Sequence, residues 1–420
     1  MADSLNNRRL KILHAADLHL GAPVAVPDCT LSPQAGQARG EALSRLVKTA
    51  IREKADLVFL GGDVFDSPNP APGARLTLLR ALTELVSQKI RVFIAPGNHD
   101  PRTPLSVWES LPPVEGVHVF ATQAEGVALE DLGVWVAGCA HNSRHVTEDL
   151  AQTLPPPPSG LTGLALLHCD PTGDIENQAH KPYAPAELSR LRRGDFAFWG
   201  LGHWHRPQIL NRSPLVLMPG AVQGAHKNET GPHGAWLVKL SGQACEADFA
   251  PLSLINHHRL DLNLEPGIKD LTDLAWLISQ KLPEKSSEET GIECLYLGLF
   301  GQSPLWRYFQ GAEADYSAEE LKKALDLAGL ELKTDGLSPM ADPAELEAGE
   351  DVLAGLLAML KKIQADPEQA ASLAKQIKKN LHPLACRQNS DDLAGYIGSL
   401  LPKVRDLALA SLLPPEQEKE

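Results

Sequence analysis

No apolar run in this chain of 420 residues approaches the roughly 18 residues that a membrane-spanning helix needs. The six cysteines form no C-x-x-C pair, and a chain of this length folds without disulfides, so we expect most of them to be reduced. Two arginines precede a short apolar stretch near the start, but Asp17 follows at once and no signal-peptide core develops. These absences predict a globular, cytoplasmic protein with two to three domains of about 150 residues each.

Positive charge is also scarce, because 39 Lys and Arg face 53 Asp and Glu, which gives a net charge of −14. Most of the excess is C-terminal, since residues 251–420 hold 17 basic and 28 acidic side chains. This balance argues against a protein that coats nucleic acid by bulk electrostatics, because phosphate binding relies on Lys and Arg. A nuclease is not excluded, since bound metal ions supply positive charge locally.

Strand and helix patterns alternate over the first 100 residues. Runs at 11–16, 56–60 and 91–95 have the length of buried strands, and residues 37–54 and 72–89 repeat apolar side chains at helical spacing. This β-α-β-α-β order predicts a mainly parallel sheet covered by helices, with functional loops at the carboxyl ends of the strands. After residue 115 the pattern becomes rich in strands, with runs at 117–120, 127–130, 134–140, 164–170, 196–202, 215–220 and 235–240.

The C-terminal part has a different pattern. From about residue 256 the chain predicts a small α+β domain, and beyond residue 340 only helical patterns remain. Two of these, 344–363 and 389–411, are amphipathic, and the second carries the stripe Leu393, Ile397, Leu400, Leu401, Val404 and Leu407. Such stripes either dock on a partner or pack within a helical bundle. We therefore predict domains at 1–255, 256–338 and 339–420.

Five short motifs each follow a predicted strand. They are Asp17-Leu-His19, Gly62-Asp63-Val-Phe-Asp66, Gly97-Asn98-His99-Asp100, His168 and Gly202-His203-Trp-His205. Carboxylate, carboxamide and imidazole ligands together suit divalent manganese, iron or zinc. Two such ions roughly 3.5–4 Å apart can hold the attacking and leaving oxygens of a phosphate ester, with one carboxylate bridging them. The motif set therefore predicts a two-metal phosphoesterase site.

The ordered set resembles the calcineurin-like metallophosphoesterase superfamily over roughly residues 10–240. ILHAADLHLG and GDVFD resemble its SbcD-type DNA-repair nuclease branch, and LLHCD, WGLGHWHRPQIL and PGAVQGAHKNETGPHGAWLVKL resemble the YhaO-like exonucleases of that branch. The resemblance implies an α/β fold, a metallophosphoesterase β-sandwich flanked by helices. It also implies a small α+β capping domain that positions DNA and a helical C-terminal region that binds a partner.

The resemblance further implies a role for each motif residue. One metal ion would be held by Asp17, His19, Asp63 and His205, and the other by Asp63, Asn98, His168 and His203, so that Asp63 is the bridge. His99 would be the catalytic histidine, which protonates the leaving oxygen or stabilises the charged transition state. Asp66 would orient His99, although archaeal and eukaryotic relatives often carry histidine at this position. The implied cofactors are two divalent metal ions, with Mn²⁺ expected ahead of Fe²⁺ or Zn²⁺.

Several histidines have a second interpretation. His141 also follows a strand and is the alternative to His168 as a metal ligand. His14 lies inside an apolar strand, the position of a core residue. His226 and His233 either contact a phosphate group of the nucleic acid or belong to a solvated loop.

Other residues near the motifs are equally open. The basic group at 190–193 is either a DNA contact or a solvated helix end. Trp108 and Trp204 either stack on nucleic-acid bases or pack against other side chains of the protein. Asp100 either supports its own loop or takes part in catalysis.

Three functions compete on this sequence. The leading one is a metal-dependent DNA exonuclease of DNA repair, which hydrolyses phosphodiesters in line and works with an SMC-like coiled-coil ATPase. The second is a phosphatase or nucleotide phosphodiesterase acting on a small molecule or a phosphoprotein, but such an enzyme needs no extension beyond residue 255. The third is mainly an assembly subunit of an ATPase complex, which has no need for an intact motif set. The resemblance also allows a homodimer formed through helices of the catalytic domain.

Overall fold

The computed structural model describes residues 9–172, 183–283, 291–310, 313–340, 349, 352–366 and short pieces between 368 and 409. The chain divides into two compact units, Met1–Arg259 with Ser286–Leu295, and Leu260–Lys285 with Tyr296–Glu420. The finer division at residues 255 and 338 stays a prediction. Among the described residues, no helix combines the length and the apolar character needed to cross a bilayer.

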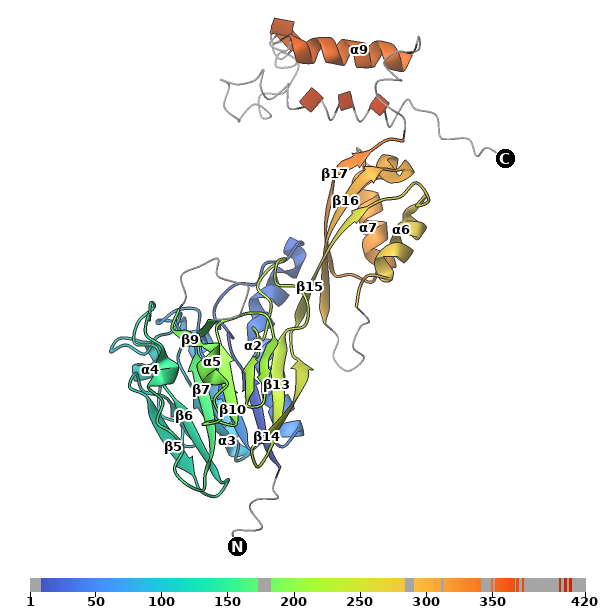
Figure 1. The fold of residues 1–420 in the computed structure, drawn as a ribbon. Helices are drawn as coiled ribbons and strands as arrows, with labels where there is room; N and C mark the ends of the chain where they lie inside the picture. The colour runs from blue at the N-terminus through green and yellow to red at the C-terminus, as the bar shows by residue number, and fades with distance from the viewer. Residues whose placement is uncertain are drawn as a thin grey trace. The chain divides into compact units, whose positions relative to one another are not determined.

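A six-stranded sheet holds the first three predicted strands, in the order β14-β13-β1-β2-β3-β4 (Figure 1). Its strands are β1 (Leu10–Ala15), β2 (Leu57–Leu60), β3 (Arg91–Ile94), β4 (Val117–Val119), β13 (Gly234–Ser241) and β14 (Ala244–Pro251). β1 to β4 are parallel, and β13 pairs antiparallel with β1. The carboxyl ends of β1, β2 and β3 therefore meet at one edge of this sheet.

A second six-stranded sheet has the order β11-β12-β10-β7-β6-β5. Its strands are β5 (Glu125–Leu129), β6 (Val134–Gly138), β7 (Thr162–His168), β10 (Phe198–Gly202), β11 (Gln208–Arg212) and β12 (Leu215–Met218). β6, β7, β10 and β12 are mutually parallel, whereas β5 and β11 close the two edges as antiparallel strands. Short elements follow these strands, namely β8 (Asp170–Thr172), β9 (Pro185–Glu187), η2 (Leu150–Gln152) and α5 (Leu188–Leu191).

The two sheets pack face to face over a core of large apolar side chains. Phe59 of β2 and Phe198 of β10 are fully buried, and their rings stack across the sandwich with centroids 6.1 Å apart. Each buried side chain of this size contributes about 2–3 kcal/mol through loss of apolar surface to water. The outer face of the first sheet is covered by α2 (Ser32–Arg52) and α3 (Pro72–Ser87), which bury Leu46 and Leu82 against it. The predicted α/β fold, a sandwich of two sheets flanked by helices, is confirmed.

Two differences from the predicted elements have local causes. α2 begins at Ser32 rather than at 37, because Pro33 occupies the first turn, where a missing N–H is tolerated. β14 was not predicted, since its side chains alternate between half-buried and exposed, as expected of an edge strand. β11, also an edge strand, has no fully buried side chain and likewise lacks the apolar run that predicts a strand.

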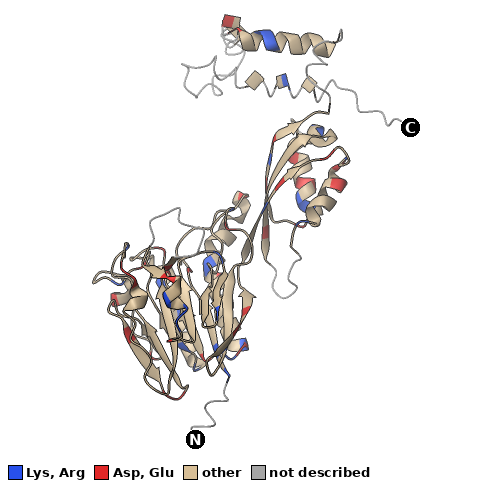
Figure 2. Ribbon diagram, viewed as in Figure 1, with Lys and Arg blue, Asp and Glu red and all other residues tan. Residues whose placement is uncertain are grey.

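The second unit holds much of a three-stranded sheet with the order β15-β16-β17, formed by Ile255–Asn263, Ile292–Gln302 and Gly329–Ser338. Its other elements are α6 (Leu271–Ser279), η3 (Pro304–Phe309) and α7 (Glu313–Ala324). α7 carries Glu313 and Asp315 in its first turn and Lys322 and Lys323 in its last (Figure 2). These charges oppose the helix macrodipole at both ends and so favour the helix.

The predicted C-terminal helices are described only in part. α9 (Val352–Ala365) overlaps the predicted 344–363 pattern and ends two residues beyond it. Leu401 is buried and packs in a small apolar cluster with Ile363 of α9, whereas Val404 is 44% exposed. Leu393, Ile397 and Leu407 of the predicted stripe lie outside the described residues.

Candidate metal centre

The predicted motif residues lie at or just beyond the carboxyl ends of five strands, each of which is parallel to a neighbour in its sheet. β1 leads to Asp17 and His19, β2 to Asp63 and Asp66, β3 to Asn98 and His99, β7 ends at His168, and β10 leads to His203 and His205. The first three strands belong to one sheet and the last two to the other. The structure therefore brings together residues that are far apart in the sequence. The His203 N–H, for example, donates a 3.0 Å hydrogen bond to Asp17, which lies 186 positions earlier.

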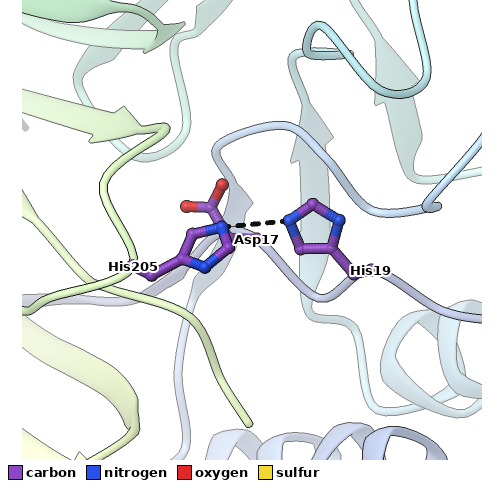
Figure 3. A group of neighbouring side chains, drawn as sticks. All are labelled: Asp17, His19 and His205. Carbon is purple, nitrogen blue, oxygen red and sulfur yellow. Dashed lines mark hydrogen bonds between the residues drawn. The ribbon is translucent and has the colours of Figure 1, made fainter. Parts of the chain in front are cut away.

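One group consists of Asp17, His19 and His205, whose ligand atoms all lie within 4.8 Å of one another (Figure 3). Nε2 of His19 and Nε2 of His205 face each other at 3.2 Å. Oδ2 of Asp17 accepts from the His203 N–H, but Oδ1 is buried and has no hydrogen-bond partner among the described residues. A buried carboxylate oxygen without a donor is costly unless a cation lies beside it.

A second group consists of Asp17, Asp63 and His168. Nδ1 of His168 lies 2.8 Å from the Gly61 carbonyl, which can only accept, so Nδ1 carries the proton. Nε2 is then a bare acceptor in the neutral ring, and it lies 3.4 Å from Oδ2 of Asp63 and 2.9 Å from Oδ1 of Asn98. Three lone-pair atoms thus converge with no donor between them, which is the arrangement of a metal-ligand set.

Asp63 lies where the two groups meet. Its Oδ2 is 3.9 Å from Nε2 of His19 as well as 3.4 Å from His168. Burial raises the pKa of Asp63 well above its ordinary value, and the charges of Asp100 and Asp17 raise it further. A nearby cation reverses this effect and keeps such a carboxylate ionised.

His99 and Asp66 adjoin the first group. Oδ1 of Asp66 lies 3.1 Å from Nδ1 of His19 and 3.5 Å from Nδ1 of His99. Its hydrogen bond to His19 lowers the pKa of Asp66. The side chain of His99 is 32% exposed, so this ring is open to a ligand from solvent, unlike the buried His168. Asp66 therefore contacts a predicted ligand more closely than the predicted catalytic histidine.

The loops hold a strained backbone. Asp17, His19, Asp63 and His203 all have a positive φ, between 45° and 116°, which non-glycine residues rarely adopt. A Cβ on Gly97 would lie 2.3 Å from Oδ1 of Asp63, so only glycine allows this close approach. Strain concentrated at one cluster of polar side chains is typical of a functional site.

The alternative histidines have other surroundings. Nε2 of His141 lies 2.6 Å from the His168 carbonyl, and burial lowers the pKa of His141 to about 4. His14 contacts the Leu201 carbonyl at 2.8 Å inside the core. His233 is 3% exposed and cannot reach a phosphate in solvent, whereas half of the His226 side chain is exposed. His141 thus contacts the main chain of His168 and belongs to none of the metal-ligand groups among the described residues.

The remaining candidates have structural partners. Asp100 accepts from the N–H groups of Gly97 and Phe65, and its burial raises its pKa to about 6. Trp108 is buried and donates to the Asp100 carbonyl at 2.6 Å, so it packs. Trp204 donates to Asp170 at 2.9 Å. In the basic group, Arg190 pairs with Asp149 at 3.1 Å.

Two residues that the sequence did not single out adjoin the cluster. Glu229 lies 2.7 Å from Nδ1 of His205. Arg39 of α2 is 7% exposed and donates to the Leu18 carbonyl, between Asp17 and His19. Burial lowers the pKa of Arg39, and the charge of Glu229 is the largest that opposes this. No local pattern marks either residue, because each acts through a contact made only in the folded chain.

The residues present fit divalent metal ions, because they combine an orphaned carboxylate oxygen, facing imidazole nitrogens and a buried carboxylate beside further negative charge. Asp17, His19, His205, Asp63, His168 and Asn98 are the residues that converge. The ring of His203 lies beside that of His168, with centroids 5.2 Å apart.

Residues 10–207 match the family model described as Calcineurin-like phosphoesterase. The chain is 26% identical over 306 residues to the uncharacterized metallophosphoesterase YhaO of Bacillus subtilis, covering 71% of this chain and 73% of that protein. It is 26% identical over 390 residues to a subunit of the nuclease SbcCD of Rhodobacter capsulatus, covering 80% and 91%. It is also 24% identical over 310 residues to the DNA double-strand break repair protein Mre11 of Sulfolobus acidocaldarius, covering 70% and 76%.

Proposed function

We propose, from the premise that residues 10–207 form a calcineurin-like metallophosphoesterase domain, that this chain is a DNA exonuclease that uses two divalent metal ions. The observation that carries the chemistry is that two ligand groups share Asp17, while Asp63 of the second group also lies 3.9 Å from His19 of the first. The names of the R. capsulatus and S. acidocaldarius relatives, a nuclease subunit and a break-repair protein, support DNA as the substrate.

Each motif residue then has a task. Asp17, His19, Asp63 and His205 would hold one ion, and Asp63, Asn98, His168 and His203 the other, with Asp63 as the bridge. When bound, the ions acidify a water molecule and neutralise the charge that develops on the phosphate. The exposed ring of His99 is positioned to give a proton to the leaving oxygen, and Asp66 lies within 3.5 Å to orient that ring. We propose Mn²⁺ as the working metal, since its preference for oxygen and imidazole ligands fits this set.

The parts beyond the catalytic domain complete the proposal. Residues 256–338 would position DNA over the metal ions, and residues 339–420 would bind an SMC-like coiled-coil ATPase. The R. capsulatus relative is one part of a larger nuclease by its name, and it matches 80% of this chain. A DNA substrate and the free thiols of the five cysteines in the described part of the chain also fit a cytoplasmic location.

One assay tests the proposal directly. Purified protein with Mn²⁺, and separately with EDTA, would be given end-labelled linear duplex and single-stranded DNA alongside bis(4-nitrophenyl) phosphate and 4-nitrophenyl phosphate. We expect progressive shortening of DNA and diester hydrolysis with Mn²⁺ only, both absent from Asp63→Asn. Hydrolysis of the monoester with DNA left intact would favour a small-substrate phosphatase, and no hydrolysis of any substrate would favour an assembly subunit.

A further inference from the structure

Glu229, in the loop between β12 and β13, is held from several sides. Its side chain is only 15% exposed. Oε1 accepts from Nδ1 of His205 at 2.7 Å, and Oε2 accepts from the Ala225 N–H at 2.6 Å. Its own N–H donates to the His226 carbonyl, and its carbonyl lies 3.1 Å from Nε2 of His233. The carboxylate therefore has a fixed position relative to His205.

This contact decides which nitrogen of His205 carries a proton. A carboxylate only accepts, so Nδ1 of His205 must be the donor. In the neutral ring Nε2 then has a free lone pair, and this is the atom that faces Nε2 of His19 at 3.2 Å. A carboxylate behind a histidine sets the tautomer and the ring orientation that a metal ion requires.

The arrangement behind His205 repeats behind His19. Oδ1 of Asp66 lies 3.1 Å from Nδ1 of His19, so both imidazoles of the first group have a carboxylate at Nδ1 and a bare Nε2 in front. The two supports differ in burial, because the Asp66 side chain is 44% exposed and the Glu229 side chain is 15% exposed. Solvent screens the Glu229 contact less, and the Ala225 N–H fixes its second oxygen.

We infer that Glu229 is a positioning residue of the metal centre, which fixes the His205 ring so that Nε2 is presented to a divalent ion. The inference rests on the proposed function, because it requires that the Asp17, His19 and His205 group binds a metal ion. It concerns the chain's own residues and does not depend on which phosphoester is the substrate.

The test is a titration of metal-free protein with MnCl₂, followed by calorimetry, on wild type, Glu229→Gln and Glu229→Asp. Glu293→Gln is the matched control, since Glu293 is 14% exposed and pairs with His258 in the same way but outside the metal-ligand groups. We expect wild type and Glu293→Gln to bind two equivalents. In Glu229→Gln and Glu229→Asp one equivalent should bind about 10- to 100-fold more weakly, while the other is unchanged. The Asp variant keeps the charge but is too short to reach His205, so it separates positioning from charge.

A second measurement reads the ring itself. In Zn²⁺-loaded protein with ¹⁵N-labelled histidine, the Nδ1–H signal of His205 is assigned by its loss in His205→Gln. It should be present in wild type and absent or rapidly exchanging in Glu229→Asp, whose carboxylate no longer reaches the ring. Two tightly bound equivalents and an unchanged Nδ1–H signal in both Glu229 variants would overturn the inference and leave the metal centre standing. Weakening of both equivalents would also overturn it, as Glu229 would then support the loops in general. A wild-type protein that binds no metal ion would overturn the proposed centre together with the inference.

Discussion

The main-chain N–H of His99 donates to Oδ1 of Asp63 at 2.8 Å. The predicted catalytic histidine is therefore tied through its backbone to the predicted bridging carboxylate. Its ring is held separately, because Nδ1 lies 3.2 Å from the main-chain carbonyl of Asp66. Gly97 makes this close contact between His99 and Asp63 sterically possible. A substitution at Asp63 can therefore remove a metal ligand, displace the loop of His99, or do both, and an experiment on Asp63 must distinguish the two effects.

Asp63→Asn separates them, because its amide oxygen can still accept from the His99 N–H. The substitution removes a carboxylate charge that lies within 4 Å of an imidazole nitrogen from each ligand group, so we expect both metal equivalents to bind more weakly and activity to be lost. In the metal-free protein it also removes a buried like charge near Asp17 and Asp100, so the melting temperature should not fall. Melting curves with and without Mn²⁺, with metal analysis of dialysed protein, measure both effects. Two tightly bound ions and near-normal turnover would refute the bridging role.

His99→Ala should lower the turnover number by roughly 10²–10⁴ while the protein keeps both metal ions, which is the usual effect of losing a positioned acid. The His118 side chain is similarly exposed, at 34%, and pairs with Glu125 outside the metal-ligand groups, so His118→Ala is the control that should leave the rate within about twofold. Steady-state kinetics and metal content are measured on the same preparations. If His99→Ala loses one metal equivalent, the residue belongs to the coordination shell.

Asp66→Asn tests which histidine this carboxylate serves. The 3.1 Å contact with His19 is shorter than the 3.5 Å contact with His99, so we expect weaker metal binding in addition to a lower rate. A double-mutant cycle with His99→Ala shows how much of the loss of rate in Asp66→Asn depends on His99. If Asp66 acts only through His99, Asp66→Asn causes no further loss of rate in a protein that already lacks the His99 ring. Unchanged metal affinity combined with full non-additivity would restrict Asp66 to orienting His99.

One geometric rule let the sequence point to residues that the structure brings together. Asp17, Asp63 and His168 each lie at the end of a parallel strand or within three residues of it, and such strand ends meet at one edge of a sandwich. Glu229 could not be found in this way, because it reaches His205 from a loop 24 positions away. Arg39 could not be identified from the sequence either, because an arginine in an amphipathic helix usually faces solvent, and Arg39 is buried only by the packing of α2.

His14 should make folding stability depend on pH. Burial lowers its pKa from 6.5 to about 4, although the contact with Leu201 acts against this. Between these two values the unfolded chain binds a proton that the folded chain does not, so the free energy of unfolding falls as the pH drops from 6.5 toward 4. We expect a loss of about 2 kcal/mol between pH 7 and 5 from this residue alone.

The check is urea unfolding in EDTA of wild type, His14→Gln and the surface control His145→Gln. His14→Gln should flatten the pH dependence, since glutamine can still donate to the Leu201 carbonyl but does not titrate in this range. His145→Gln should leave it as in wild type. Equal pH dependence in all three proteins would show that His14 is not a source of acid sensitivity.

Substitutions at two neighbouring positions of the C-terminal region can distinguish docking on a partner from packing within the chain. Leu401 is 5% exposed and packs with Ile363 of α9, whereas Val404 is 44% exposed. A charge at Leu401 would be buried without a partner, so Leu401→Glu should destabilise this region by several kcal/mol and lower its melting temperature. Val404→Glu places the same charge on the surface and should leave the melting temperature within a degree or two.

If residues 339–420 dock on a coiled-coil ATPase, Val404→Glu should weaken that association at unchanged stability and unchanged Mn²⁺-dependent hydrolysis, because no predicted metal ligand lies beyond His205. Pull-down of the purified ATPase, with melting curves for both variants, measures this. Loss of binding in Leu401→Glu alone would support only packing, because that variant removes the apolar contact which holds the helices together. Val404→Glu is therefore the variant that distinguishes docking from packing. If Val404→Glu still binds the ATPase as wild type does, this exposed position is not part of the docking surface.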